Sequence, residues 1–264
     1  MIRIMCIGPG RIYEAMVTLS FDNNLVIAPT LTYFISPYSP AQISLALDKF
    51  NLTIDYQVIS DTYFSTQYDL TLWSHDHWYL QQALKLCAID SIDSQYFLIH
   101  DADLVLLQPY TPISNDVLNF KAENLWNSHQ HLYGQMIEQL LGLKRTIPCS
   151  LVNEIMPYAK QDWDALKRLI EERYHTNFLN AIANLQPLDS TKWFSEYELL
   201  GIYKTNHSGW THSIESSQPP INSWDDFYNT KWSQRSILKF HTHPLKQMNA
   251  MQAHQVINFL KNLT

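Results

Sequence analysis

The chain has 264 residues, a formal net charge of −7 and three cysteines. Its length allows a substantial core within one large domain. The negative charge argues against nucleic acid as a partner, because affinity for phosphate backbones comes mainly from clustered Lys and Arg, which the sequence lacks. The cysteines are too few and too scattered for a disulfide framework or a zinc site, which favours a reducing compartment.

No segment approaches the ~20 apolar residues that are needed to span a bilayer, and the N-terminus has no basic flank followed by a long apolar core. We therefore expect a cytoplasmic protein without a transmembrane segment. Peripheral contact with the inner face of the cell membrane stays open, because such a protein could act on a lipid-linked molecule at that surface.

The first sixty residues alternate short apolar runs with helical patterns. The predicted strands are 2–7, 31–36 and 53–59, and the predicted helices are 11–19 and 40–50. Ser39 is expected as the N-cap of the second helix, with Pro40 in its first position. Alternating strands and helices predict right-handed βαβ units and a mainly parallel sheet, whose strand ends meet at one edge.

Asp61 follows the third predicted strand, so we expect it at the same edge as the ends of the other strands. There it could contact the base or ribose of a nucleotide, and capping of the next turn is an equal alternative. The predicted helix 78–86 carries Gln82 and Lys85 on nearby faces. A lysine here could form charge-assisted bonds with a diphosphate, and the alternative is an ordinary surface lysine.

A buried strand is predicted at 96–100, and it stops at two carboxylates, Asp101 and Asp103. Residues two apart project to the same side of an extended backbone, so the two charges need a cation beside them. Hard oxygen ligands favour Mn²⁺ or Mg²⁺, which keep positions open for phosphate oxygens. We therefore predict a metal-diphosphate site at the end of this strand, where ligand sites of open α/β sheets lie.

A second Asp-x-Asp, Asp162-Trp163-Asp164, precedes a helical pattern. Acidic residues are common as the N-cap and in the first turn of a helix, so we interpret this pair as structural. Helices are predicted around 133–143, 163–174 and 178–185, and an acceptor pocket is expected among them.

Glu196 and Glu198 stand among aromatic residues on a helix that Ser195 opens. Such surroundings can raise the pKa of a carboxyl group and make it a general base, while the alternative is a pair of first-turn residues favoured by the helix dipole. Farther on, His241 and His243 follow an apolar run at alternate positions. They can share one face and supply the imidazole ligand that suits Mn²⁺ better than Mg²⁺.

Four features follow one another in the sequence: the helix 78–86, the pair Asp101-Ala102-Asp103, the block 194–199 and the pair His241-Thr242-His243. Taken in this order, they resemble a bacterial family of GT-A-fold glycosyltransferases of the DUF6492 type, over roughly residues 50–245. The resemblance implies an α/β fold with a GT-A-type, Rossmann-like, mainly parallel sheet flanked by helices. A helical acceptor-side insertion would follow the Asp-x-Asp strand. The chain would then be one domain, 1–264, with a nucleotide-sugar-binding half at 1–110 and an acceptor-binding half with a closing segment at 111–264.

The resemblance also implies metal-dependent transfer of a sugar from a nucleotide-sugar donor, preferably a UDP-sugar, to a hydroxyl of a glycan or lipid-linked acceptor in surface polysaccharide synthesis. Asp103 and either His241 or His243 would bind Mn²⁺ or Mg²⁺, with Asp101 nearer the ribose or sugar of the donor. Glu196 would be the base if the enzyme inverts, with Glu198 in reserve.

Two other functions remain open from the sequence. A metal-dependent phosphoesterase would also use Asp and His clusters, but it needs ligands on more strand ends than the sequence places. A non-catalytic glycan- or nucleotide-binding module would keep the fold and lack turnover.

Overall fold

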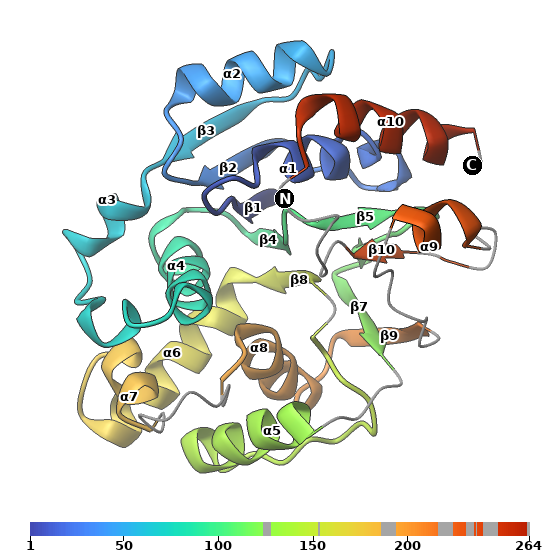
Figure 1. Ribbon diagram of the computed structural model, residues 1–264. Helices are drawn as coiled ribbons and strands as arrows, with labels where there is room; N and C mark the ends of the chain where they lie inside the picture. Colours follow the sequence, from blue (N-terminus) through green and yellow to red (C-terminus); the bar gives the residue numbers. More distant parts are fainter. Residues whose placement is uncertain are drawn as a thin grey trace. The chain divides into compact units, whose positions relative to one another are not determined.

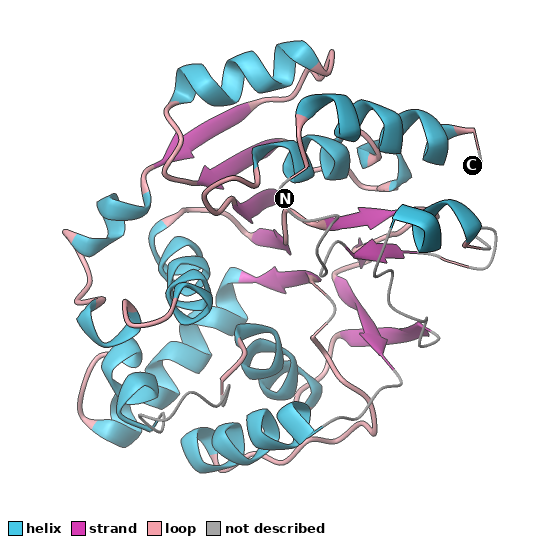
Figure 2. Ribbon diagram, viewed as in Figure 1, coloured by secondary structure: helices cyan, strands magenta, loops and turns pink. Residues whose placement is uncertain are grey.

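The structure is a computed structural model that describes residues 1–123, 128–152, 154–185, 194–215, 224–230, 235, 237–239 and 248–262. The chain separates into two compact units, each built from discontinuous segments. Unit 1 comprises residues 1, 61–99 and 113–217, and unit 2 comprises residues 2–60, 100–112 and 218–264. Both units contain helices and strands (Figure 2). These boundaries differ from a division at 110, and the roles expected of the two halves stay a prediction.

Unit 2 begins with strands that alternate with helices. Its first elements are β1 (Ile2–Cys6), α1 (Ile12–Leu19), η1 (Asp22–Asn24), β2 (Leu31–Ile35), α2 (Pro40–Lys49) and β3 (Tyr56–Ile59). The strands pair in the order β3-β2-β1, and both pairs are parallel. The predicted parallel arrangement is therefore confirmed, although the third strand begins at Tyr56, three residues later than expected.

The start of α2 follows the predicted chemistry. Ser39 is the N-cap, and its side chain accepts a hydrogen bond from the backbone N of Gln42. Gln42 Oε1 in turn accepts from the backbone N of Ser39 at 2.9 Å, which completes a capping box, and Pro40 takes the first helical position.

The rest of unit 2 comes from the middle and the end of the chain. These elements are β5 (Leu104–Leu106), α9 (Trp224–Asn229), β10 (Ile237–Lys239) and α10 (Ala250–Lys261). Strand β10 pairs antiparallel with β5, and α10 packs against α1 (Figure 1). Apolar side chains of α1, α2 and α10 share one buried cluster with Met5 and Phe34 of the sheet. The sequence pattern predicts a C-terminal helix from 244 to 263, and the described helix spans 250 to 261.

Unit 1 carries more helix than unit 2. Its helices are α3 (Asp61–Ser65), η2 (Thr71–Trp73), α4 (His77–Ser91), α5 (Ser128–Leu141), α6 (Lys160–Tyr174), α7 (Phe178–Leu185) and α8 (Glu196–Thr205). Its strands are β6 (Ile113–Ser114), β7 (Val117–Glu123), β8 (Ile155–Ala159) and β9 (Trp210–Glu215), together with most of β4 (Tyr96–His100). Strand β8 lies beside β4, and a second sheet has the order β6-β7-β9 with β7 and β9 parallel.

The helices of unit 1 agree with the sequence patterns more closely than the strands do. Helix α7 has the predicted bounds, and α8 begins directly after Ser195 as expected. Helix α6 begins at Lys160 with Ala159 as its N-cap, so Asp162 lies in the first turn and does not cap the helix. Within the described residues, none of the helices combines the length and the apolar character that are needed to cross a membrane.

Candidate functional site

The two carboxylates after β4 lie on a turn of unit 2. Strand β4 ends at His100, and Ala102 and Asp103 form a turn before β5 begins at Leu104. The backbone N of Leu104 donates to the carbonyl oxygen of Asp101 at 3.3 Å. The expectation that extended backbone carries both aspartates is therefore wrong, although the strand does end where the apolar run predicted.

One face of α1 holds this turn. Arg11, the N-cap residue of α1, places its Nη2 2.7 Å from Oδ2 of Asp103. Thr18 donates from Oγ1 to the carbonyl oxygen of Ala102 at 2.8 Å. Glu14 accepts from Nε of Arg11 at 2.6 Å. Positions 11, 14 and 18 fall on one side of a helix, so α1 presents a charged and polar stripe to the turn.

The ion pair with Arg11 supplies positive charge to Asp103 from within the protein. Burial lowers the pKa of Arg11, but the carboxylates of Asp103 and Glu14 raise it by more, so the guanidinium keeps its charge. The side chain of Glu14 is fully buried, and that of Asp103 is 12% exposed. Arg11 therefore joins the turn to the first turn of α1 through two carboxylates, those of Asp103 and Glu14.

His100 connects the two strands that flank the turn. Its ring is buried, and Nε2 lies 3.0 Å from the carbonyl oxygen of Leu104. Burial, and to a smaller extent the charge of Arg3, lowers the pKa of His100 to about 3. The ring is therefore neutral at physiological pH and acts as a link between β4 and β5.

A second polar cluster lies in unit 1, where α4 meets the start of α8. Nζ of Lys85 is 2.6 Å from Oε1 of Glu196, and both side chains are buried. Gln82, one turn earlier on α4, accepts from the backbone N of Glu196 at 3.3 Å. Nζ of Lys85 also lies 4.7 Å from the ring centroid of Tyr197. The structure thus brings together Gln82, Lys85 and Glu196, and the alternative of an ordinary surface lysine does not hold for Lys85.

Glu198 faces different neighbours from Glu196, as expected for residues two apart on a helix. Its Oε1 accepts from Oγ of Ser150 at 3.2 Å and from the backbone N of Leu151 at 3.1 Å. Its Oε2 lies 2.7 Å from Nη2 of Arg145. Burial raises the pKa of Glu198, although Arg145 acts in the opposite direction. Glu198 therefore ties α8 to the segment before β8.

Asp61 opens α3 of unit 1. Its Oδ1 accepts a hydrogen bond from the backbone N of Thr62 at 2.9 Å, within the first turn of that helix. An N-cap side chain accepts from a backbone N two or three positions later, so this contact to the next residue does not decide for capping. Capping and a nucleotide contact of Asp61 both stay predictions.

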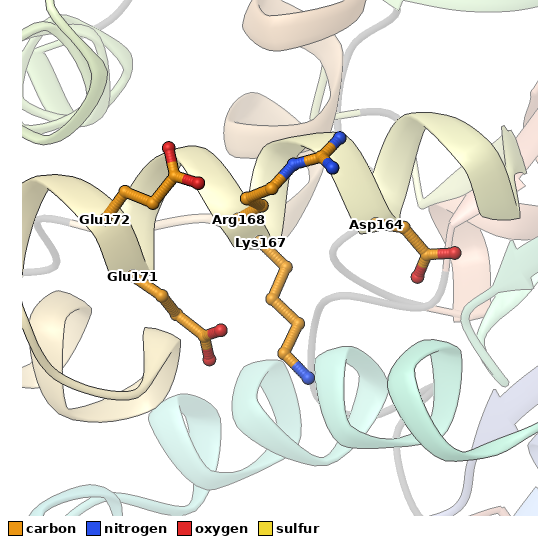
Figure 3. A pocket seen from close by; sticks show the side chains of 5 residues that line it. All are labelled: Asp164, Lys167, Arg168, Glu171 and Glu172. Carbon is orange, nitrogen blue, oxygen red and sulfur yellow. The ribbon is translucent and has the colours of Figure 1, made fainter.

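The surface of α6 carries an open hollow of about 430 Å³ (Figure 3). Its lining side chains all project from α6: Asp164, Lys167, Arg168, Glu171 and Glu172. Lys167 extends toward α4, where its Nζ lies 2.9 Å from each carboxylate oxygen of Asp90. None of the candidate site residues lines this hollow. Mixed charges on one helix face indicate a solvated surface.

The sequence was also compared with protein families. Residues 37–247, which are most of the chain, match a family described as a family of unknown function, DUF6492. The chain belongs to the DUF6492 family. This confirms the family expected from the resemblance. No curated protein matches the chain.

Solved structures similar to this DUF6492 protein include glycosyltransferases. The galactosyltransferase LgtC, in complex with donor and acceptor sugar analogues, is 12% identical with a TM-score of 0.51, and the match covers 98% of this chain and 95% of that chain. An active-site mutant of LgtC is 11% identical with a TM-score of 0.50 and the same coverage. Mouse xyloside xylosyltransferase 1 has a TM-score of 0.43 and 10% identity, with 91% and 96% covered. The LgtC matches confirm the expected GT-A-like α/β fold.

The aspartates of this DUF6492 protein fit a divalent cation by donor type. Asp101 and Asp103 offer the oxygen ligands that Mn²⁺ and Mg²⁺ prefer. In the part of the chain that the structure describes, no three His, Cys, Asp or Glu side chains form a group able to hold a metal. His241 and His243 lie outside the described residues. Metal binding at this turn therefore stays a prediction.

Arg11 and Glu14 are parts of this site that the sequence reasoning did not identify. Arg11 follows Gly8-Pro9-Gly10, a sequence typical of a turn, and it contacts a residue 92 positions away. A signal was present in the sequence, because Arg11, Glu14 and Thr18 put polar groups on one side of an otherwise apolar helix. Polar side chains on a predicted packing face need partners, which are to be sought at neighbouring strand ends.

Proposed function

We propose that this DUF6492 protein is a metal-dependent glycosyltransferase. It moves a sugar from a nucleotide-sugar donor, preferably a UDP-sugar, to a hydroxyl of a glycan or of a lipid-linked acceptor, as in bacterial surface polysaccharide synthesis. The reaction breaks the bond between the sugar and the diphosphate and forms a glycosidic bond. The acceptor hydroxyl loses its proton, and the nucleoside diphosphate leaves.

The observation that carries this proposal is the position of the Asp101–Asp103 turn. It follows directly after β4 in a fold of the kind that galactosyltransferase LgtC has. The carboxyl ends of strands in open α/β sheets are where ligands bind, and paired carboxylates there suit a diphosphate that is carried by a divalent cation.

In this proposal Asp101 and Asp103 hold Mn²⁺ or Mg²⁺, together with His241 or His243. The ion, when bound, stabilises the negative charge of the departing diphosphate. The chain's own contribution is to fix the turn that carries the carboxylates, and the hydrogen bond from Thr18 to the carbonyl oxygen of Ala102 does this. Asp61, Gln82 and Lys85 remain candidates for donor contacts.

We assign the role of base to Glu196 if the enzyme inverts, and we keep Glu198 in reserve. Glu198 already accepts from Ser150 and Leu151 on one oxygen and pairs with Arg145 on the other, so its contacts are those of a structural tie. Glu196 is held by Lys85, whose Nζ lies 2.6 Å from its Oε1, and among the described contacts no such set of hydrogen bonds ties both of its oxygens to the segment before β8. Both carboxylates are fully buried. An acceptor hydroxyl must therefore reach Glu196 through movement of the surrounding side chains.

The proposal is tested by calorimetric titration of the purified protein with a panel of nucleoside diphosphates and their sugars. Each titration is made with Mn²⁺ and again with a chelator. We expect one nucleotide to bind only with the metal, and Asp103→Asn to abolish this binding. Asp164→Asn is the matched control, because it makes the same change in the second Asp-x-Asp, where Asp164 pairs with Lys160 on the surface of α6.

Three results would count against this function. Absence of binding to every nucleotide would exclude the transferase. Unchanged binding by the Asp103→Asn variant would remove the site assignment. Release of phosphate from simple esters without an acceptor would favour a phosphoesterase, and binding of a donor without any turnover would favour a non-catalytic module.

A further inference from the structure

Arg11 forms an ion pair with Asp103, the carboxylate on which the proposed cation site depends. Its Nη2 lies 2.7 Å from Oδ2 of Asp103, and its Nε lies 2.6 Å from Oε2 of Glu14. Ligand oxygens approach Mg²⁺ to about 2.1 Å, so an ion on Oδ2 of Asp103 would compete with the guanidinium for the same oxygen. The residue that compensates the charge of the turn is therefore also an obstacle to a metal ion there.

The surroundings of Arg11 allow its side chain to move while its backbone stays in place. Its side chain is 27% exposed, whereas that of Glu14 is fully buried. The backbone just before it is fixed, because the N of Gly10 donates to the hydroxyl of Tyr38 at 2.5 Å. Gly10 has a φ of 77°, a value that suits glycine and sets the direction in which the chain enters α1. A change of partner would thus need only rotations of the Arg11 side chain.

We infer that Arg11 exchanges partners during donor binding. It pairs with Asp103 while no metal ion is bound, and it binds the diphosphate of the donor once a metal ion is bound to Asp103. The inference rests on the proposed function. A diphosphate bound through a metal on Asp103 lies within reach of the displaced guanidinium. The planar fork of arginine matches phosphate oxygens as well as it matches a carboxylate.

The exchange predicts opposite effects of one substitution on two ligands. In Arg11→Gln, no guanidinium competes with the metal ion for Asp103. Mn²⁺ alone should therefore bind this variant more tightly than it binds the wild-type protein. The diphosphate loses a charge-assisted partner, so UDP or GDP should bind about tenfold more weakly at saturating Mn²⁺. The first affinity is measured from the paramagnetic resonance signal of free Mn²⁺, and the second by calorimetry with UDP and with GDP.

Two further variants separate the exchange from other effects. Arg168→Gln removes the same charge from the exposed face of α6, and both affinities should stay as in the wild-type protein. In the double variant Arg11→Gln with Asp103→Asn, the gain in Mn²⁺ affinity should disappear, since Asp103 is the group that Arg11 blocks. A thermal melt of each variant shows that it is folded.

Only the opposite pair of changes supports the exchange. Weaker binding of both ligands indicates a structural role for Arg11 and overturns it. Tighter Mn²⁺ binding with unchanged nucleotide binding indicates a counter-ion that never contacts the donor, and it overturns the exchange while the proposed function stands. A wild-type protein that binds neither UDP nor GDP with Mn²⁺ overturns the exchange, and the full nucleotide panel then decides whether the proposed function fails too.

Discussion

Nζ of Lys85 and Oε1 of Glu196 lie 2.6 Å apart, although 111 positions separate the two residues in the chain. Both side chains are buried, so two opposite charges have been removed from water together. Such a pair adds little net stability, because desolvation offsets the attraction, but loss of one member leaves an uncompensated buried charge. The pair therefore favours the one arrangement of α8 on α4 in which the two charged groups meet.

Lys85→Met should destabilise the protein by about 3–5 kcal/mol, because the carboxylate of Glu196 is left buried without its cation. Equilibrium unfolding in urea measures this as a decrease in the free energy of unfolding. The double variant Lys85→Met with Glu196→Leu should recover most of the loss, since neither charge is then buried.

The exposed pair Lys144 and Glu138, 3.5 Å apart, is the control for this prediction. Its side chains are 81% and 48% exposed, and Lys144→Met should cost at most about 1 kcal/mol, as surface ion pairs do. If the double variant at positions 85 and 196 were as unstable as the sum of its single variants, the two residues would not be energetically coupled.

Gly201→Ala should destabilise the protein by about 1–3 kcal/mol, although alanine favours helices more than glycine does. A Cβ at Gly201, in the middle of α8, would lie well inside the van der Waals contact distance of Cδ1 of Leu151 and 3.0 Å from its Cβ. Helix α8 and the segment before β8 would have to separate. A lower midpoint of thermal unfolding measures the effect.

Gly134 of α5 provides the matched control, because among the residues that the structure describes a Cβ there meets only Arg145, at 3.9 Å. Gly134→Ala should leave stability unchanged or raise it by up to about 1 kcal/mol. Shortening the obstructing side chain in the double variant Gly201→Ala with Leu151→Ala should make the alanine at 201 less costly than it is alone. An equal cost in both backgrounds would show that Leu151 is not the obstacle.

Thr18→Val should show that the hydroxyl of α1, and not its shape, holds the Asp101–Asp103 turn. Valine has nearly the same volume but cannot donate to the carbonyl oxygen of Ala102, now 2.8 Å from Thr18 Oγ1. A buried carbonyl without its donor costs about 1–3 kcal/mol. Urea unfolding measures the loss, and Thr18→Ser, which keeps the donor, should lose less. A loss in Thr18→Val no larger than that in Thr18→Ser would contradict a dominant role for the hydroxyl.

Local chemistry explains which helices could be predicted from the sequence. The N-cap at Ser39 with Pro40 after it, and the start of α8 after Ser195, depend on residues within one turn of each other. Such signals act before any tertiary contact forms. They placed α2 within one residue of its observed bounds and the start of α8 directly after Ser195.

Apart from β4, the strands of unit 1 were not predicted, and their residues show why. Strand β8 is fully buried and contains Pro157, which normally argues against a strand. It lies at the end of its sheet beside β4, where a missing backbone donor is tolerated. Strand β7 pairs with β9, and Leu118 faces Trp210 across 92 positions of sequence. No local signal reports a partner at that distance.

Residues of the candidate site could be predicted where the signal lies within a single segment of the sequence. The end of β4 at two carboxylates could be read from the apolar run, and Gln82, Lys85 and Glu196 were each singled out separately. That Lys85 pairs with Glu196, and Arg11 with Asp103, depends on how distant helices pack. The sequence carried the residues but not their pairing.

Asp90 links α4 to α6, and its charge should make stability depend on acid pH. Its carboxylate accepts from Tyr68 at 2.8 Å, from Trp163 at 3.0 Å and from Lys167 at 2.9 Å. Burial raises the pKa of Asp90, but the hydrogen bonds from Lys167, Trp163 and Tyr68 together lower it below the ordinary value of 3.8. The native state therefore binds fewer protons than the unfolded state at pH values between the two pKa values.

Asp90→Asn should consequently cost about 1–3 kcal/mol at pH 7, since it removes a charged acceptor shared by three donors. The contribution of Asp90 is complete above pH 3.8 and is lost as the pH falls through the lower pKa of the folded protein. Wild type and variant should therefore converge in stability as urea unfolding is repeated from pH 5 downward. Asp164→Asn, at the exposed partner of Lys160, should change stability by no more than about 0.5 kcal/mol at pH 7. A constant difference between wild type and Asp90→Asn down to pH 2 would mean that the hydrogen bonds of Asp90 do not depend on its charge.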